Sequence, residues 1–253
     1  IVILILAVII RMSPLSEINL DEDGNVTDQG IFKQMVNALK FPQLVLGVIT
    51  LILYVAAEVI AGDTIGKFGK QLGVYGENGD LYLKLTSFTM VAMVVGYLLG
   101  VSLIPKYVSQ VTALKASGIL GIILVFLIVY VDASVMVQLP LLPVMPLVII
   151  LVALLGLANA LCWPAIWPLA LQDLGGYTKI AGAILVMGII GGAVFPLVYG
   201  YLAEVINLSN EAQGITATAK SGNQIAYLML LPAYLMILFF AIKGHKYRSW
   251  SRK

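Results

Sequence analysis

Long apolar runs alternate with short polar segments along most of the chain. Each run holds about 20 residues or more, the length that an α-helix needs to cross the hydrocarbon core of a bilayer. The pattern predicts six full transmembrane helices, at residues 41–62, 85–104, 113–131, 144–171, 176–203 and 223–242. Because only helices and closed barrels satisfy their backbone polar groups in lipid, the expected fold class is an all-α polytopic membrane protein.

The two ends of the chain differ from this pattern. Residues 1–11 are almost entirely apolar, but a helix of this length covers only about 15 Å, roughly half of a bilayer core. We therefore expect the end of a transmembrane helix whose beginning is missing. Residues 12–40 are expected to form a cytoplasmic linker, with a short amphipathic helix at 31–40. Residues 41–242 then form the six-helix bundle, and residues 243–253 a basic cytoplasmic tail.

Composition supports a membrane protein over a soluble one. Hydrophobic residues make up 60% of the chain and charged residues 11%, with a mean hydropathy of +1.00. Soluble domains contain about 25% charged residues. A net charge of only +2, without a basic, aromatic-rich patch, argues against a nucleic-acid partner. The single cysteine, Cys162, cannot form an intrachain disulfide.

The distribution of Lys and Arg predicts which end of the bundle faces the cytoplasm. If the linker is cytoplasmic, eleven of these residues lie on the inner side and four on the outer side. Cytoplasmic loops of membrane proteins carry an excess of Lys and Arg, so this distribution supports a cytoplasmic linker and tail. The inner set is Arg11, Lys33, Lys40, Lys106, Lys115, Lys179, Lys243, Lys246, Arg248, Arg252 and Lys253, and the outer set is Lys67, Lys70, Lys84 and Lys220.

Glu58 is the most informative polar residue, because it lies inside the first full apolar run. A charged side chain near mid-membrane costs about 2.5–3.5 kcal/mol on insertion scales and normally faces the bundle interior. Tyr54 lies one turn earlier on the same helix face. A hydroxyl and a carboxyl on one stripe suit the binding of substrate hydroxyls, and the alternative for Glu58 is a structural hydrogen bond to a neighbouring helix. Asp63 is expected to end this helix at the outer interface.

A second polar stripe lies in the run at 144–171. Asn159, Trp163 and Trp167 are spaced four residues apart, which places them on one face of a helix. The amide offers two donors and an acceptor for adjacent sugar hydroxyls. An indole can cover the apolar face of a pyranose ring while its N–H donates to a hydroxyl. The alternatives are an interhelical hydrogen bond for Asn159 and anchoring at the membrane interface for Trp167.

Prolines and glycines indicate where helices bend and touch. Pro164 and Pro168 each remove a backbone donor and free a carbonyl one turn earlier, a break that membranes tolerate where it lines a cavity. Gly96 and Gly100 form a GxxxG pair, which lets helices approach closely. A similar stripe of small residues in the fifth run consists of Gly188, Gly192, Pro196 and Gly200.

The sequence contains no constellation typical of catalysis or metal binding. HExxH, GxSxG and GxxxxGK motifs are absent, and the only histidine, His245, lies outside the apolar runs. We therefore expect neither an enzyme nor a resident cofactor or metal ion.

Three segments resemble the carboxy-terminal half of the major facilitator superfamily, and more closely its fucose and glucose/galactose proton-symporter group. They are LYVAAEVIAGDTIG, NALCWPAIWPLALQDLGGYTK and ILVMGIIGGAVFPLVYG. The resemblance extends over essentially the whole chain. It implies a fold of two six-helix halves around a central sugar site. Residues 1–11 would then be the end of the sixth helix, and the six full runs would be helices seven to twelve.

The resemblance also implies roles for individual residues. Tyr54 and Glu58 match the family's Tyr-Val-small-small-Glu segment, and Asn159 falls in its Asn-rich tenth helix. Many relatives have Gly-Arg where this chain has Gly96 and Tyr97. The acidic residues that carry the proton in this family belong to the amino-terminal half, so proton coupling is implied by the resemblance alone.

Together with the residue patterns, the resemblance implies uptake of a hexose, such as glucose, galactose or fucose, across the inner (plasma) membrane by proton-coupled alternating access. This chain would be the carboxy-terminal half. Its partners would be a missing amino-terminal half, the lipid bilayer and a small sugar, with no nucleic acid. Sodium is the alternative coupling ion, and the alternative function is a non-transporting membrane protein, either a sensor or a degenerate half-permease. The expected sugar contacts are Tyr54, Glu58, Asn159, Trp163 and Trp167.

Overall fold

The computed structural model describes residues 31–76, 79–140, 143–214 and 220–250. The predicted helix end at 1–11, the acidic part of the linker and the last residues of the tail lie outside the described residues. Within the described part, six spans are long and apolar enough to cross a membrane, as predicted. The all-α polytopic fold class is therefore confirmed.

Helix α2 (Ile31–Ala38) precedes the spans. The first three spans are the single helices α3 (Pro42–Gln71), α4 (Leu81–Leu103) and α5 (Gln110–Tyr130). The fourth span joins α6 (Leu147–Asn159) to α7 (Cys162–Leu171). The fifth joins η2 (Gly175–Tyr177), α8 (Thr178–Val186), η3 (Met187–Ile189) and α9 (Ile190–Ala212). The sixth joins α10 (Gly222–Ala226), η4 (Tyr227–Leu230), α11 (Leu231–Ile242) and η5 (Gly244–Lys246).

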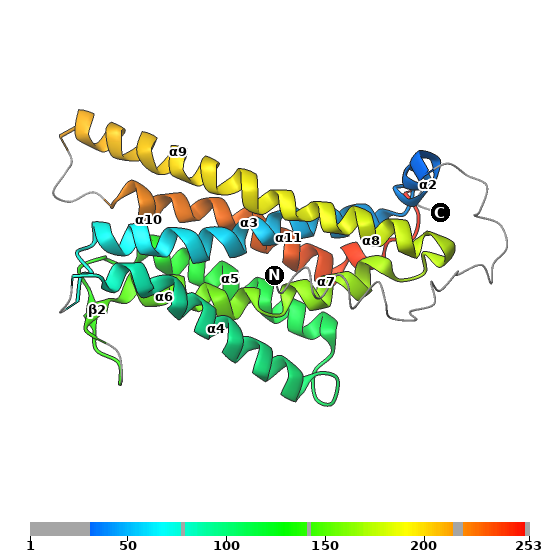
Figure 1. Ribbon diagram of the computed structural model, residues 1–253, viewed down its shortest axis with the longest axis horizontal. Helices are drawn as coiled ribbons and strands as arrows, with labels where there is room; N and C mark the ends of the chain where they lie inside the picture. The colour runs from blue at the N-terminus through cyan, green and yellow to red at the C-terminus, as the bar shows by residue number, and fades with distance from the viewer. Residues whose placement is uncertain (1–30, 77–78, 141–142, 215–219, 251–253) are drawn as a thin grey trace, which may run out of the picture.

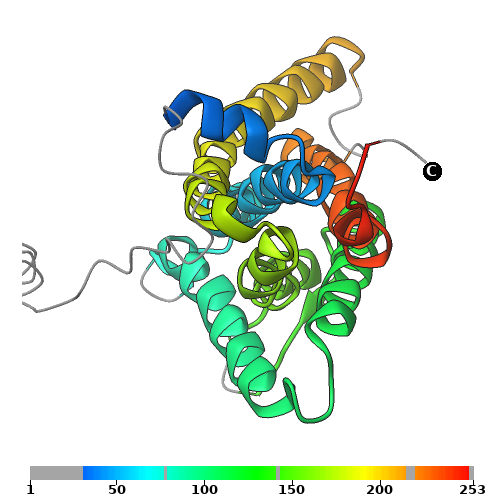
Figure 2. The same cartoon turned by 90° about the vertical axis from the view of Figure 1, so that its right-hand side faces the viewer.

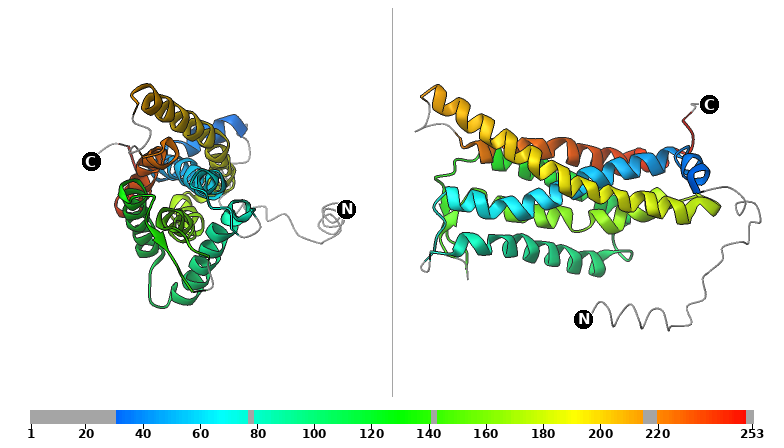
Figure 3. Two further views of the ribbon diagram at one scale, coloured as in Figure 1. Left: turned by 90° about the vertical axis from the view of Figure 1, so that its left-hand side faces the viewer. Right: turned by 45° about the horizontal axis from the view of Figure 1, so that its top comes forward.

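The spans run side by side as one elongated bundle (Figure 1). Helix α2 and the carboxy-terminal residues lie at one end, here called the α2 end, and the oblique view in Figure 3 shows them together again. A small antiparallel hairpin of β1 (Met136–Val137) and β2 (Met145–Pro146) lies at the opposite end, here called the hairpin end. Because the number of crossings is even, the chain returns to the end from which it started.

Helix α3 and the α6–α7 span form the centre of the bundle. Helix α3 packs against α4, α6, α7, α9 and α11, and the end-on view shows α7 surrounded by α3, α4 and α5 (Figure 2). In their most apolar windows, 56% of α3 and 61% of α6–α7 is buried, compared with 28% of both α4 and the fifth span. Helices α4 and α9 therefore each have a face that the described helices leave uncovered.

Helix α3 is longer than predicted. Asp63 does not end it, but lies exposed on a helix that continues for about two more turns. The prediction was wrong because the apolar face continues beyond this carboxylate, where Ile65 and Phe68 are fully buried. The helix ends instead in a Schellman motif, with Gly73 in the left-handed conformation (φ 75°) and the Val74 N–H donating back into the last turn.

The fourth span is broken where the prolines predicted it. Helix α6 ends at Asn159 and α7 begins at Cys162. Pro164 explains the break, because it cannot donate to the carbonyl of Ala160, four residues earlier, and its ring clashes with that carbonyl. Pro168 lies inside α7, which continues past it.

Helices approach closely at the predicted glycines. A Cβ atom added at Gly96 would lie 2.5 Å from the Cβ of Ala160, and one added at Gly100 would lie 2.3 Å from the side chain of Leu161. The GxxxG pair thus packs α4 against the α6–α7 junction. Gly188 packs on α3 in the same way, whereas Gly200 has no neighbour within 4 Å. The small-residue stripe of the fifth span is therefore a helix contact over only part of its length.

Candidate functional site

Tyr54 and Glu58 lie one turn apart on α3. Tyr54 is 1% exposed and Glu58 is partly buried. Their side chains interact directly, as expected for residues four positions apart on a helix. The Tyr97 phenol of α4 and the Cys162 thiol at the start of α7 lie within electrostatic range of the Glu58 carboxyl. This carboxyl therefore lies among α3, α4 and α7.

Trp163 and Trp167 lie on α7 beside Tyr54. The two indole centroids are 5.6 Å apart, with their planes inclined by 44°. The ring of Tyr54 lies 6.4 Å from that of Trp163. The three rings form a continuous aromatic surface between α3 and α7, and both indoles keep part of their surface uncovered by the described residues.

Asn159 is the last residue of α6 and is 1% exposed. Its Oδ1 accepts a hydrogen bond from the hydroxyl of Tyr234 in α11, over 3.0 Å. Its buried Nδ2 has no hydrogen-bond partner within the described residues, and the same holds for the buried Nε1 of Trp167. Buried polar groups in proteins are nearly always paired. Two donors in one span thus remain without an acceptor, and the oxygens of a ligand would satisfy them.

The five predicted site residues occupy one region, where α3 meets the α6–α7 span. Tyr54, Glu58, Trp163 and Trp167 form a contiguous group. Asn159 adjoins it through Tyr234, which lies within electrostatic range of Glu58. The interhelical hydrogen bond considered for Asn159 is present, but it occupies only the oxygen of the amide.

Two bacterial proteins are similar in sequence to this chain. The glucose/galactose transporter of Brucella abortus biovar 1 (strain 9-941) is 28% identical over 214 residues, which cover 85% of this chain and 45% of the transporter. A Helicobacter pylori (strain J99) protein whose name contains the same words is 25% identical over 244 residues, which cover 96% of this chain and 52% of that protein. The chain thus spans about half the length of these curated relatives. No family model matches the chain.

The fold is similar to that of FucP, the E. coli fucose:proton symporter, a major facilitator superfamily transporter. Two crystal structures of FucP, one in the outward conformation, match with TM-scores of 0.71 and 0.72 at 18% identity. They cover 99% of this chain and 53% and 52% of FucP. The resemblance to the sugar symporters of the major facilitator superfamily is confirmed. The described helices form about half of the major facilitator fold.

Two tyrosines near the predicted site are not among the predicted contacts: Tyr234, which the sequence patterns do not single out, and Tyr97, which the sequence analysis names only as a difference from many relatives. Tyr234 is fully buried near the middle of its span, whereas tyrosines of membrane helices concentrate at the interfaces. This unusual depth is the one signal that could have found it. Tyr97 borders a cavity of about 280 Å³ beside the helix break, and the cavity is lined by Tyr97, Gly100, Val101, Ile104, Gln110, Leu161, Pro164 and Ala165.

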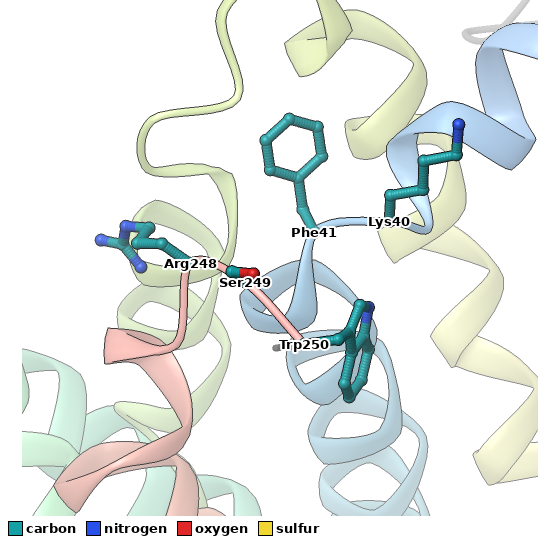
Figure 4. A pocket seen from close by; sticks show the side chains of 5 residues that line it. All are labelled: Lys40, Phe41, Arg248, Ser249 and Trp250. Carbon is teal, nitrogen blue, oxygen red and sulfur yellow. The ribbon is translucent and has the colours of Figure 1, made fainter. Parts of the chain in front are cut away.

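A second hollow lies at the α2 end of the half-fold, in a different place from the predicted site. It has a volume of about 340 Å³ and is lined by Lys40, Phe41, Arg248, Ser249 and Trp250. Figure 4 shows the Lys40 and Arg248 side chains pointing to opposite sides. Arg248 also pairs with Asp173 over 2.9 Å. The two cations therefore do not converge on one point in this hollow.

Proposed function

We propose that this chain is the carboxy-terminal half of a transporter that takes up a hexose together with a proton across the inner membrane, by alternating access between two halves. The substrate class comes from its relatives, whose names specify glucose, galactose and fucose. The two-half architecture comes from the fold of FucP, of which this chain covers about half.

The observation that carries the proposal is the pair of buried, unpartnered donors on the α6–α7 span. A hexose presents many hydroxyl oxygens around an apolar ring face. The Nδ2 of Asn159 and the Nε1 of Trp167 would donate to such oxygens, each with a net gain of about 0.5–1.5 kcal/mol. The Trp163 ring would cover the apolar face. Glu58 and Tyr54 would accept from or donate to the remaining hydroxyls.

Charge distribution supports the proposed orientation. Eight described Lys and Arg residues lie toward the α2 end and four toward the hairpin end, and cytoplasmic loops carry such an excess. We therefore place the α2 end in the cytoplasm. The first set is Lys33, Lys40, Lys106, Lys115, Lys179, Lys243, Lys246 and Arg248, and the second is Lys67, Lys70, Lys84 and Lys220.

An uptake assay in membrane vesicles tests the proposal. D-glucose, D-galactose and L-fucose are offered in turn, under a pH step or a sodium gradient. We expect one or more of these sugars to accumulate with the pH step and to ignore the sodium gradient. Uptake that follows sodium would overturn the proton coupling, and no uptake of any of the three would overturn the sugar assignment.

Site variants test the residues. Asn159→Ala removes a donor and Glu58→Gln removes the carboxylate, and each should raise the KM for the sugar by roughly 3–30-fold at unchanged abundance. Matched controls are Asn37→Ala on α2 and Glu211→Gln at the exposed end of α9, which should leave the KM unchanged. Wild-type KM values in both site variants would refute the assignment.

A further inference from the structure

Tyr234 is held rigidly beside the proposed site without lying on its aromatic surface. It is 0% exposed, and its ring packs directly on Gly121 of α5. A Cβ atom at Gly121 would lie 2.1 Å from the ring, so only glycine at this position leaves space for the tyrosine. The hydroxyl therefore has a fixed position on α11, and that position is 3.0 Å from the Oδ1 of Asn159.

In the structure this hydrogen bond is made by the oxygen end of the amide, and the nitrogen end has no partner within the described residues. An asparagine side chain carries an acceptor oxygen and a donor NH₂ group, and rotation about its last bond exchanges them. With the Tyr234 hydroxyl donating to Oδ1, the oxygen is occupied and the unpartnered Nδ2 is the end left for a ligand. A flipped amide would present an acceptor instead, and the same site would then select a hydroxyl that donates.

We infer that Tyr234 is a positioning residue that holds Asn159 as a hydrogen-bond donor toward the substrate, so that the site selects a sugar hydroxyl acting as an acceptor. The inference rests on the proposed function, since it assumes that the ligand is a hexose. Tyr234 itself need not touch the sugar. Its effect on specificity would pass through the orientation of the Asn159 amide.

Fluorinated sugars distinguish the two orientations of the amide. Replacing a hydroxyl by hydrogen removes both its acceptor and its donor, whereas replacing it by fluorine leaves a weak acceptor and no donor. If Asn159 donates, replacing the hydroxyl at one ring position by hydrogen should lower the affinity for the sugar roughly 3–10-fold. Replacing the same hydroxyl by fluorine should retain most of the affinity. The analogues used are those of whichever of D-glucose, D-galactose and L-fucose the wild-type protein takes up.

The test compares inhibition of uptake by these analogues in Tyr234→Phe and wild-type protein. Removing the hydroxyl frees Oδ1 and lets the amide rotate, so we expect the preference for fluorine over hydrogen at that position to disappear. The KM for the parent sugar should rise roughly 3–10-fold, while kcat stays near the wild-type value. Asn159→Ala should lose the same preference, and combining the two substitutions should add no further change.

Two further variants test whether a changed analogue pattern is due to the Tyr234 hydroxyl in particular. Tyr227→Phe removes a different buried hydroxyl of the same span, one that lies 2.7 Å from the Thr64 hydroxyl, and it should leave the analogue pattern unchanged. Gly121→Ala displaces the Tyr234 ring without removing its hydroxyl, and it provides the same test if Tyr234→Phe does not reach the membrane. Inhibition ratios do not depend on the amount of protein, so reduced abundance does not obscure them.

The outcomes separate the two proposals. If the wild-type protein takes up none of the three sugars, the proposed function fails. If it takes up a sugar but Tyr234→Phe and Gly121→Ala keep the wild-type analogue pattern, or weaken all analogues equally, Tyr234 has only a structural role and the inference is overturned.

Discussion

Two polar regions inside the bundle contain the same kinds of side chain, but they differ in how many of their polar atoms have a hydrogen-bond partner within the protein. One is the proposed sugar site around Asn159. The other, here called the hairpin-end cluster, consists of Thr64, Gln71, Tyr199, Asn223, Gln224 and Tyr227.

In the hairpin-end cluster, each side chain finds a partner within the protein. The hydroxyls of Tyr227 and Thr64 lie 2.7 Å apart, and the Tyr199 hydroxyl donates to the Asn223 carbonyl over 2.8 Å. The side-chain amide of Asn223 donates to that of Gln71. The Gln224 amide donates to two backbone carbonyls, that of Ile128 in α5 and that of Val131 just after it. None of the buried side-chain atoms of this cluster lacks a partner within the described residues.

The proposed sugar site differs, because the Nδ2 of Asn159 and the Nε1 of Trp167 have no hydrogen-bond partner within the described residues. An unpaired donor in an apolar interior costs about 1–3 kcal/mol, and a ligand that accepts a hydrogen bond from it would relieve this cost. The comparison shows that the presence of buried Tyr, Asn and Gln does not by itself mark a site. The proposed site combines unpaired donors with an adjoining aromatic surface, and it needs both features to stand out, since the Oε1 of Gln43 and the Oγ1 of Thr89 are also unpaired within the described residues. We therefore expect changes in the cluster to affect stability and changes in the site to affect affinity.

The largest expected effect is on stability, from Gln224→Leu. The Gln224 Nε2 donates to the carbonyls of Ile128 and Val131, over 2.8 and 2.7 Å. The substitution leaves both carbonyls unpaired and should lower the free energy of unfolding by about 2–4 kcal/mol, as measured by thermal unfolding in detergent. The exposed Gln213→Leu at the end of α9 is the matched control. A changed sugar KM in the folded Gln224→Leu protein would contradict the separation of the two regions.

The bundle could be predicted from sequence because a bilayer imposes a strict length on each apolar run. The six spans and the break before Pro164 follow from that length and from proline chemistry. The end of α3 did not follow, because Asp63 lies on an exposed face and the buried face beside it continues. Hydropathy of the whole run does not show which face of a helix a single carboxylate occupies.

The hydrogen bonds within the proposed site could not be predicted from sequence patterns. Helix periodicity places Asn159 and Trp167 on one face, because it depends only on spacing within one helix. The partner of Asn159 is Tyr234, 75 residues later and on another span. Which end of the amide is occupied depends on how α11 packs on α5 through Gly121, a tertiary contact that no local pattern encodes.

A smaller effect, on affinity, is expected from Trp167→Phe. Phenylalanine keeps an aromatic ring but removes the unpartnered Nε1 donor, so the sugar KM should rise roughly 3–10-fold. Thermal stability should be unchanged or slightly higher, because the folded protein loses an unsatisfied buried group. Trp250→Phe, in the exposed tail, should change neither quantity. A loss of stability in Trp167→Phe at wild-type KM would instead support the alternative in which Trp167 only anchors the helix.

The smallest expected effect is a pH dependence at the hairpin end, outside the membrane-spanning helices. The backbone N–H of Ser134 donates to Asp132 over 2.9 Å, and this bond, followed by the Ser134 side chain and the charge of Lys220, lowers the pKa of the Asp132 carboxyl. Because the folded-state pKa lies below the unfolded value of about 3.9, the stabilisation is fully present above that pH. It is lost as the pH falls through the lower, folded-state pKa.

Asp132→Asn isolates this contribution, because an amide can still accept the hydrogen bond but does not titrate. The melting temperatures of wild-type and Asp132→Asn protein should differ slightly at pH 6, and the difference should shrink as the pH falls below the unfolded-state pKa of about 3.9. Asp80→Asn serves as a comparison, because Asp80 forms an exposed ion pair with Lys84 at the start of α4, over 2.9 Å. A difference between wild type and Asp132→Asn that persists unchanged at pH 3 would show that the Asp132 charge does not stabilise the hairpin end.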